Sequence, residues 1–323
     1  MRFLHEDEGY SAALDQVFRK FGIPRAQIEK DYFITHVLWA LQASGLGLWF
    51  KGGTCLSKGY GIISRFSEDL DLKIESGRAA GMPADPNWKG EKETHIARRR
   101  EWFEALASTA NVPTCTASIN EAFVDDRHRS VVIDVLYPGA YVAELGPVIR
   151  PWVRLEVGSA RVTPFLDRPI TSWLHDHAAS LGALEGLVDN RPPSIRCIHP
   201  LVTLIEKLDA MTRRWGRDDL DPFVFVRHWE DAAGVIAALP TLPAFPTSAC
   251  ALVDEMLAAH QIRERPRADH EAFTLRPSAR VDALLAGHAA IADMFYGDRP
   301  RRTIAEACEL IRGWIEVNIG AGA

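Results

Sequence analysis

The chain has 323 residues, of which 47% are hydrophobic and 25% are charged, and its formal net charge is −6. This composition excludes a disordered, collagen-like or disulfide-scaffold chain, and the length fits about two domains. No apolar run approaches the roughly 20 residues that a membrane-spanning helix needs. Residues 1–8 become acidic where a signal peptide needs an apolar core, so we expect a cytoplasmic protein.

The basic residues are clustered, although the net charge is negative. A local basic patch can still bind phosphates, because salt screens charges beyond about 8–10 Å. Each cluster taken alone is more typical of a solvated face. The clusters are Arg98–Arg100, Arg127 with Arg129, Arg213 and Arg214 with Arg217, and Arg299 with Arg301 and Arg302.

The cysteine and histidine patterns do not indicate a zinc site. Five cysteines are widely spaced without a CxxC pair, which argues against a disulfide framework and fits a reducing compartment. The run His175-Asp176-His177 has no third ligand at helical spacing. We expect it to be a surface loop.

The first 198 residues mix helical and strand patterns. Residues 77–90 predict a loop, and residues 162–174 are ambiguous. In chain order the predicted elements are helices near 8–21 and 26–43, a strand at 48–50, a helix near 55–63, a strand at 69–74, a helix at 94–108, and strands at 130–136, 152–157 and 194–197.

After Pro200 the pattern becomes entirely helical. We expect an α+β domain over residues 1–198 and a helical domain over residues 199–323. The predicted helices lie near 200–215, 222–238, 247–261, 277–294 and 303–318.

A strand that ends in Gly52-Gly53-Thr54 and passes directly into a helix carries the first chemical signal. Glycines allow the backbone to approach a ligand closely, and the first N–H groups of a helix are free to face an anion. The Thr54 hydroxyl, and that of Ser57 one turn later, would add donors. The turn is a candidate phosphate cradle.

The second signal is Asp69-Leu70-Asp71, fifteen positions after Thr54. At this spacing on a strand both carboxylates share one face, where they repel each other unless a cation lies between them. Mg²⁺ commonly bridges carboxylates and nucleotide phosphates. Together with the glycine turn, this pair predicts a nucleotidyltransferase site that uses two Mg²⁺ ions and an NTP.

These residues resemble the first motif of the DNA polymerase β-like nucleotidyltransferase superfamily. The closer resemblance is to the AbiEii/AbiGii toxin family of type IV toxin–antitoxin and abortive-infection systems, and it covers nearly the whole chain. The segments that carry it are Ile28–Tyr32, Phe50–Lys58, Arg65–Leu72, His199–Leu208, and the tail from Met294 to Gly297 with the final helix.

The resemblance implies that residues 1–198 form the nucleotidyltransferase domain and that the helical domain, residues 199–323, contributes two catalytic residues to the active site. Lys207 matches a lysine expected to contact nucleotide phosphates; without the family it would be an ordinary exposed helix lysine. An acidic residue follows in an Arg-Asp-x-x-Asp-like motif, for which two segments compete, 217–221 and 227–231. We favour Asp231 over Asp218, although His228 replaces the second residue of the motif.

A third carboxylate completes such metal sites from a neighbouring strand. Glu156 and Asp134 both qualify, because each is an acid flanked by apolar residues on a predicted strand. The family order favours Glu156, and Asp134 can instead pair with an arginine. We find no dedicated catalytic base in the sequence.

The resemblance implies transfer of NMP from an NTP to RNA, with the 3′ end of tRNA as the expected acceptor. Blocked translation would follow, and a separately encoded antitoxin would neutralise the protein. Arginines near 98–100 and 213–217 would contact the tRNA. The alternatives are a small-molecule nucleotidyltransferase of the antibiotic-modifying type and a non-catalytic RNA- or protein-binding member.

Overall fold

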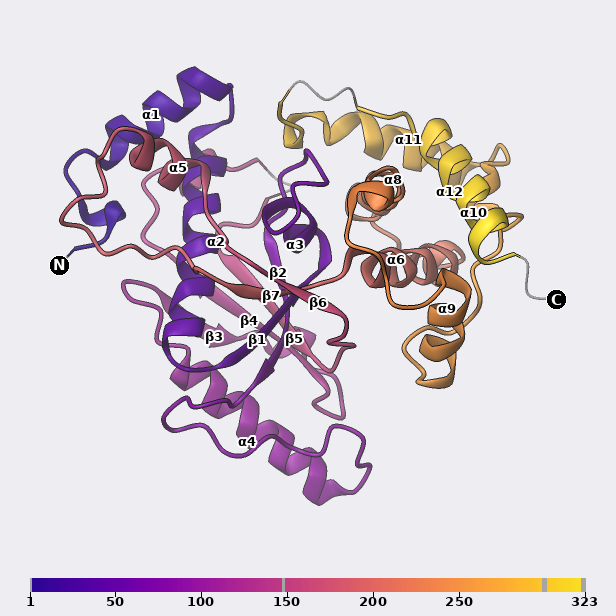
Figure 1. The fold of residues 1–323 in the computed structure, drawn as a ribbon, viewed down its shortest axis with the longest axis horizontal. Coiled ribbons are helices and arrows are strands. Elements are labelled where there is room, and N and C mark those ends of the chain that lie inside the picture. The colour runs from indigo at the N-terminus through magenta and orange to yellow at the C-terminus, as the bar shows by residue number, and fades with distance from the viewer. Residues whose placement is uncertain (1, 147–148, 298–300, 321–323) are drawn as a thin grey trace. The chain divides into compact units, whose positions relative to one another are not determined.

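The computed structural model describes residues 2–146, 149–297 and 301–320. The chain divides into two compact units, which are described separately (Figure 1). Unit 1 comprises residues 1–59, 66–162 and 166–197, and unit 2 comprises residues 60–65, 163–165 and 198–323. Two short segments that precede residue 198 therefore belong to the helical unit, a feature that a single division at residue 198 does not capture.

The mixed half of the chain contains five helices and seven strands within the described residues. They are α1 (Tyr10–Phe21), α2 (Arg25–Ala43), β1 (Gly47–Lys51), α3 (Gly52–Lys58), β2 (Asp69–Glu75), α4 (Glu93–Thr109), β3 (Thr116–Ile119), β4 (Ser130–Leu136), β5 (Val153–Gly158), β6 (Phe165–Arg168), α5 (Trp173–Ser180) and β7 (Ile195–Ile198).

The strands form one mixed sheet in the order β3-β4-β5-β2-β1-β7-β6. β1 and β2 are antiparallel, and each has a parallel neighbour on its other side, β7 and β5 respectively. β4 is antiparallel to both β3 and β5. This sheet with its helices confirms the expected α+β class.

The alternating sequence of β2 gives the central sheet two different faces. Leu70, Leu72 and Ile74 are buried, and they alternate with half-buried Asp69 and Asp71. Successive side chains of a strand point to opposite faces, so burial of the leucines fixes the register and directs both carboxylates to the other face.

Helix α2 carries three consecutive charged residues, Glu29, Lys30 and Asp31, all of which are buried. A buried charge needs a partner, and each of these side chains has one on a different segment. The Glu29 carboxylate accepts hydrogen bonds from the backbone N–H groups of residues 140 and 141. Asp31 pairs with Lys58 at 2.5 Å. These contacts explain why an apolar helix contains a run of charges.

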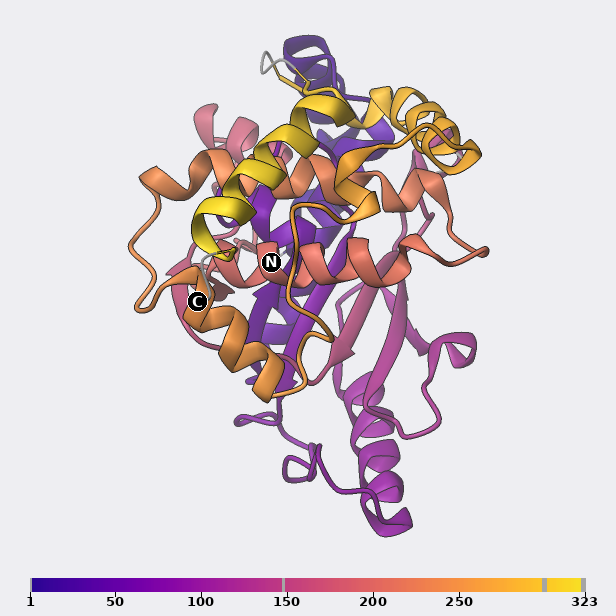
Figure 2. The same ribbon diagram turned by 90° about the vertical axis from the view of Figure 1, so that its right-hand side faces the viewer.

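Unit 2 is built from helices, which carry orange to yellow colours in Figure 2. The final helix begins with a capping box in which the side chains of Thr303 and Glu306 bind each other's backbone N–H groups. The helices are α6 (Pro200–Trp215), α7 (Pro222–Phe225), α8 (Arg227–Ala238), α9 (Ala249–Ala258), α10 (Glu271–Thr274), α11 (Ala279–Ala290) and α12 (Ile304–Asn318).

Several predicted elements differ from the observed ones. The helix predicted near 222–238 is divided into α7 and α8, and α3 covers Gly52–Lys58 instead of 55–63. Strand β3 and the short helix α10 were not predicted. The ambiguous residues 162–174 contain β6 and the start of α5.

His175 and His177 lie in helix α5, so the prediction of a surface loop was wrong. His175 is buried: its Nε2 atom lies 2.8 Å from Asn190 Oδ1, and its Nδ1 atom lies 2.7 Å from Ser172 Oγ. The polar character of the run suggested a loop. A histidine can nevertheless lie in a core when both of its ring nitrogens have hydrogen-bond partners, as those of His175 do.

Among the described residues, none of the helices combines the length and the apolar character that crossing a membrane requires.

Candidate active site

Three carboxylates meet on the half-buried face of the sheet in unit 1. Asp69 and Asp71 lie two positions apart on β2, and Asp71 is in register with Glu156 on the parallel strand β5. Directly paired residues of adjacent strands point to the same face, so the Asp71 and Glu156 side chains are immediate neighbours. The structure thus brings Glu156 to the predicted pair.

The electrostatics of Glu156 reflect this crowding. Glu156 is an exposed residue of β5, but desolvation of its carboxyl group, followed by the negative charges of Asp71 and Asp69, raises its pKa to about 7. Each effect disfavours a further negative charge at this position. A cation placed among these oxygens would remove the repulsion.

Gly52 gives the Asp71 carboxylate its space. Its φ angle is +74°, in the region that favours glycine, and a Cβ atom at this position would lie 1.7 Å from Asp71 Oδ2. No side chain can therefore replace the glycine without displacing the carboxylate. The turn between β1 and α3 is shaped around the second aspartate of the motif, and Gly53 and half-buried Ser57 follow it on α3.

Thr54 does not present its hydroxyl to a phosphate site, contrary to our expectation. The side chain is buried, and Oγ1 donates to the Asp69 carbonyl oxygen at 2.6 Å. Because that donation uses the only proton of Thr54, the 2.9 Å contact with Ser67 Oγ must be donated by Ser67. Thr54 instead fixes the start of β2, and with it the position of Asp69.

Asp134 has different partners from Glu156. Arg154 lies between it and β2: Arg154 Nε is 3.2 Å from Asp134 Oδ1, and Arg154 is in register with Asp69. The side chain of Asn120 donates to the other carboxylate oxygen of Asp134 at 2.6 Å. Of the two candidate third carboxylates, Glu156 adjoins the aspartate pair, and Asp134 is satisfied by an arginine and an amide.

Oxygen donors of this kind suit a hard cation such as Mg²⁺. Among residues 2–146, 149–297 and 301–320, no group of three or more His, Cys, Asp or Glu side chains is positioned to hold a metal ion. Mg²⁺ is commonly held by one or two carboxylates completed by phosphates and water. The residues present fit that mode, with Asp69, Asp71 and Glu156 as the available ligands.

A second charged centre lies within unit 2. Asp231 on α8 is fully buried, and Arg65 contacts both of its oxygens, with Nε at 2.7 Å and Nη2 at 2.6 Å. Lys207 on α6 approaches the same carboxylate at 2.8 Å. Despite the desolvation that accompanies burial, the two cations hold the pKa of Asp231 below its usual range.

The structure separates the two candidates for the late acidic residue. Asp231 shares its carboxylate with Lys207, whereas the Asp218 side chain is fully exposed, 3.7 Å from Arg280. Lys207 is a buried lysine paired with Asp231, so the description of an ordinary exposed helix residue does not apply. His228, which replaces the aspartate of the family motif, is next to this centre, and burial lowers its pKa well below the usual value.

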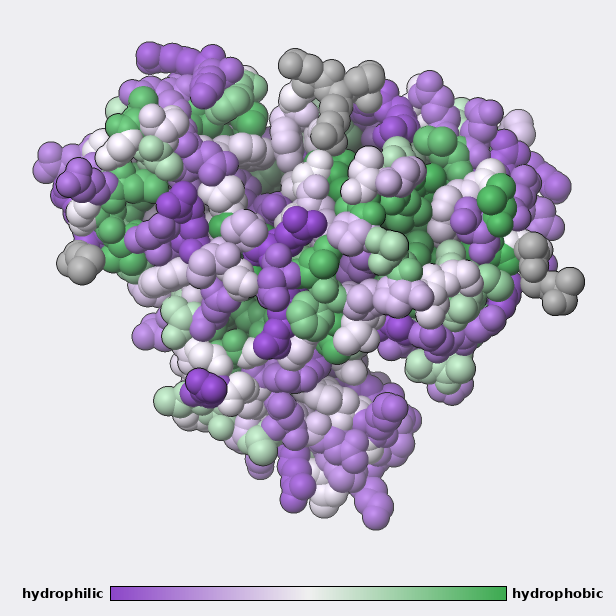
Figure 3. Space-filling view, in the orientation of Figure 1, coloured by the Kyte–Doolittle hydropathy of each residue, from purple (hydrophilic) through white to green (hydrophobic). Residues whose placement is uncertain are grey.

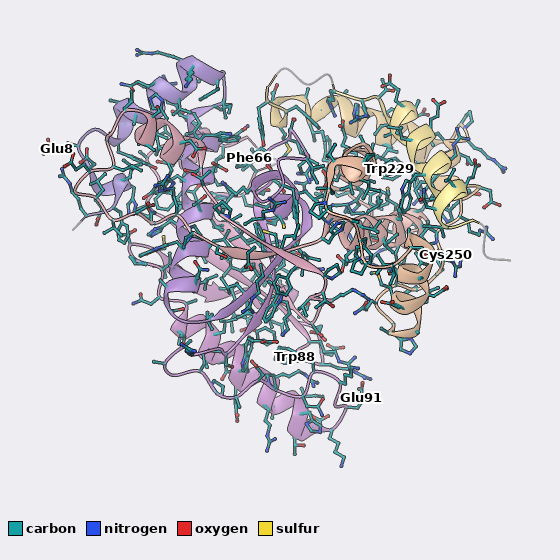
Figure 4. All side chains as sticks on the ribbon, in the orientation of Figure 1. Glu8, Phe66, Trp88, Glu91, Trp229 and Cys250 are labelled. Carbon is teal, nitrogen blue, oxygen red and sulfur yellow. The ribbon has the colours of Figure 1, made fainter. Side chains whose placement is uncertain are left out.

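A pocket of about 480 Å³ lies beside the Arg65–Asp231 pair within unit 2. Its wall includes Phe295 with the Arg301 guanidinium stacked 4.2 Å above the ring, and Glu230 accepts a hydrogen bond from Arg301 Nε at 2.9 Å. Trp229, labelled in Figure 4, precedes this glutamate, and its indole N–H donates to the carbonyl oxygen of Ala272 at 3.1 Å.

Most of the basic clusters serve structural contacts. Arg99 is buried and donates to the carbonyl oxygens of residues 87, 90 and 127. Arg127 and Arg129 both pair with Glu91, which is labelled in Figure 4. Arg98 and Arg100 remain exposed on α4, where Figure 3 shows mainly hydrophilic side chains.

The remaining basic clusters lie in unit 2. Arg213 and Arg217 pair with Asp209 and Asp219, and Arg299 lies outside the described residues.

Sequence reasoning missed three parts of these centres. Arg65 lies in one of the segments that carry the family resemblance, but no role was predicted for it, although it contacts Asp231. The ion pair of Lys30 with Glu68 was not predicted, because the residues lie 38 positions apart. The Nη1 atom of Arg150 lies 3.2 Å from Asp69 Oδ1. This contact was also not predicted, because no sequence motif surrounds Arg150.

The glycine turn, the paired aspartates of β2 and the neighbouring Glu156 on a mixed sheet fit a nucleotidyltransferase. The family model described as nucleotidyl transferase AbiEii toxin, type IV TA system, matches residues 36–309. The chain belongs to this family of toxins, and membership implies a separate antitoxin partner. No curated protein and no solved structure matches the chain.

Proposed function

We propose that the protein transfers an NMP group from an NTP to an RNA hydroxyl, with the 3′ end of tRNA as the acceptor, and thereby blocks translation. The acceptor oxygen forms a bond to the α-phosphorus, and pyrophosphate leaves. The observation that carries the proposal is the cluster of Asp69, Asp71 and Glu156 beside the Gly52 turn, where excess negative charge calls for a cation.

In this proposal Asp69, Asp71 and Glu156 hold Mg²⁺, and the absence of a Cβ atom at Gly52 leaves room for the Asp71 carboxylate. Gly53 and Ser57 lie on the same short helix and are the proposed contacts for the nucleotide. When bound, Mg²⁺ lowers the pKa of the acceptor hydroxyl and offsets charge on the phosphates.

Lys207 is the proposed cation of the helical unit. Asp231 holds its ammonium group at 2.8 Å, which restricts a flexible side chain to one direction. A lysine fixed in this way can stabilise negative charge on a phosphate without first having to be ordered. Arg98 and Arg100 are the exposed arginines of unit 1 that we propose for RNA contact.

The test is incubation of the purified protein with bulk tRNA, Mg²⁺ and each labelled NTP in turn. We expect label on tRNA from one NTP and a loss of about 100- to 1,000-fold in Asp69→Ala, because several kcal/mol of metal stabilisation disappear. Asp218→Ala, at the exposed acid of unit 2, is the matched control and should transfer normally.

Two outcomes would redirect the proposal. Transfer to small hydroxyl compounds but not to tRNA would assign the chain to the small-molecule nucleotidyltransferases. If expression of Asp69→Ala arrested growth as strongly as the parent, the effect would come from binding, and the transfer reaction would be rejected as its cause.

A further inference from the structure

Two buried residues of unit 1 form an ion pair with no role in the catalysis proposed above. The Lys30 ammonium and the Glu68 carboxylate contact each other, and each side chain is only 1% exposed. A buried ion pair is a poor source of stability, because desolvation of two charges offsets their attraction. A feature of this kind therefore calls for another explanation.

The pair holds one residue, Arg150, by both of its backbone groups. The Arg150 N–H donates to Glu68 Oε2 at 2.9 Å, and its carbonyl oxygen accepts from Lys30 Nζ at 2.5 Å. Residue 150 precedes β5 in a segment without regular structure. The ion pair therefore fixes the backbone of Arg150, as the hydrogen bonds of a sheet or a helix would do elsewhere.

This position directs the Arg150 side chain to the candidate metal site. Nη1 lies 3.2 Å from Asp69 Oδ1 and 3.5 Å from Glu68 Oε1. The Arg150 side chain is 31% exposed and that of Asp69 is 25% exposed, so solvent and solutes reach both. A fixed cation therefore faces the first aspartate of the site from the open side.

We infer that Arg150 binds a phosphate of the nucleotide and that, before the nucleotide arrives, its guanidinium neutralises Asp69. The inference rests on the proposed function and adds a residue to its site. A guanidinium presents several donors in one plane that match a phosphate, and it repels a divalent cation that binds the same carboxylate alone. Arg150 thereby favours entry of the cation together with the nucleotide.

The inference predicts opposite effects on two ligands. Mn²⁺ without nucleotide should bind Arg150→Gln about tenfold more tightly than the parent, because a competing positive charge is gone. An NTP analogue with a non-cleavable α,β-bond, titrated with Mn²⁺, should bind about 10- to 100-fold more weakly. Electron paramagnetic resonance of free Mn²⁺ and calorimetry measure these affinities without any turnover.

Two further variants separate charge from shape and local from general effects. Arg150→Lys keeps the charge but not the planar donor group, so Mn²⁺ affinity should stay near that of the parent while analogue binding weakens. Arg191→Ala is the matched control: Arg191 is also 31% exposed and pairs with Asp189 at 2.7 Å away from the site. It should change neither affinity.

The measurements distinguish a wrong role for Arg150 from a wrong proposed function. If the parent transfers NMP but Arg150→Gln binds both ligands within twofold of the parent, the role of Arg150 is wrong and the proposed function stands. If both affinities shift as expected but no acceptor is labelled, the proposed transfer fails and the role of Arg150 stands. A parent that binds neither Mn²⁺ nor the analogue overturns both.

Discussion

The two units treat buried and half-buried charge in opposite ways. In unit 2 one carboxylate, Asp231, faces two cations, Arg65 and Lys207, and is completely enclosed. In unit 1 Asp69, Asp71 and Glu156 crowd together on an accessible sheet face, and burial and mutual repulsion raise the pKa of Glu156. In the first centre two cations surround one carboxylate, whereas in the second three carboxylates lie close together.

This difference shows what each centre contributes. A buried ion-pair network in which every group has a partner holds helices in one arrangement, and removing one member leaves a buried charge without a partner. A crowded cluster of like charges lowers stability in exchange for a place where a ligand binds. The same residue types therefore have opposite effects on stability in the two units.

The largest expected effect concerns the enclosed centre. Asp231→Asn leaves Arg65 and Lys207 buried beside a neutral amide, and we expect a loss of about 3–5 kcal/mol in the free energy of unfolding. Urea denaturation measures it. Asp218→Asn, at a fully exposed position, should change stability by less than about 0.5 kcal/mol. Equal effects of the two variants would show that the Asp231 centre is not the stabilising network described here.

A smaller effect is expected at the glycine that makes room for Asp71. Gly52→Ala places a Cβ atom 1.7 Å from Asp71 Oδ2 at a φ angle of +74°, so we expect a loss of about 2–4 kcal/mol from steric overlap and backbone strain together. Gly22→Ala isolates the strain, because Gly22 has a φ angle of +68° and open space around it. It should lose only about 1 kcal/mol. Similar thermal shifts for the two variants would contradict the close approach of Asp71.

Lowering the pH should destabilise unit 1, because its buried histidines are neutral in the folded state. Burial lowers the pKa of His175 to about 4, and its Nε2–H donates to Asn190 Oδ1, which leaves Nδ1 as an acceptor that protonation would destroy. The unfolded chain takes up this proton near pH 6.5 and the folded chain only near pH 4. Stability is therefore full above pH 6.5 and falls toward pH 4, by about 2–3 kcal/mol from this group.

Denaturation at several pH values tests this expectation. His175→Gln keeps a donor toward Asn190 but cannot titrate, so its stability should change less between pH 6.5 and pH 4 than that of the parent. Hydrogen exchange followed by mass spectrometry, corrected for intrinsic rates, should locate the parent's acid-induced opening at α2 and α5. Opening confined to unit 2 would contradict the assignment.

The smallest expected effect has the opposite sign. Glu156→Gln removes a charge that Asp71 and Asp69 repel, so without metal we expect a gain of about 1 kcal/mol in stability together with the loss of transfer activity. Thermal melts in EDTA measure the gain. Added Mg²⁺ should raise the melting temperature of the parent more than that of the variant. A destabilised Glu156→Gln in EDTA would mean that the repulsion from Asp71 and Asp69 does not cost stability.

The local patterns were sufficient for much of unit 1. The alternation of β2 placed Asp69 and Asp71 on one face, and the glycine turn before α3 marked the adjacent backbone. These features follow from neighbouring residues, so they can be read without long-range information. The direction of the Thr54 hydroxyl was not readable, because a carbonyl oxygen fifteen residues away competes for its proton.

By itself the sequence determined the α+β class, the alternation that exposes the aspartates and the family resemblance. Tertiary structure alone decided that Glu156 adjoins Asp71 and that Asp134 pairs with Arg154, since strand register depends on the packing of the whole sheet. It also decided the pairing of Arg65 with Asp231, 166 residues apart, and of Lys30 with Glu68 around Arg150. Buried charges choose partners by position in space, and no local pattern encodes that choice.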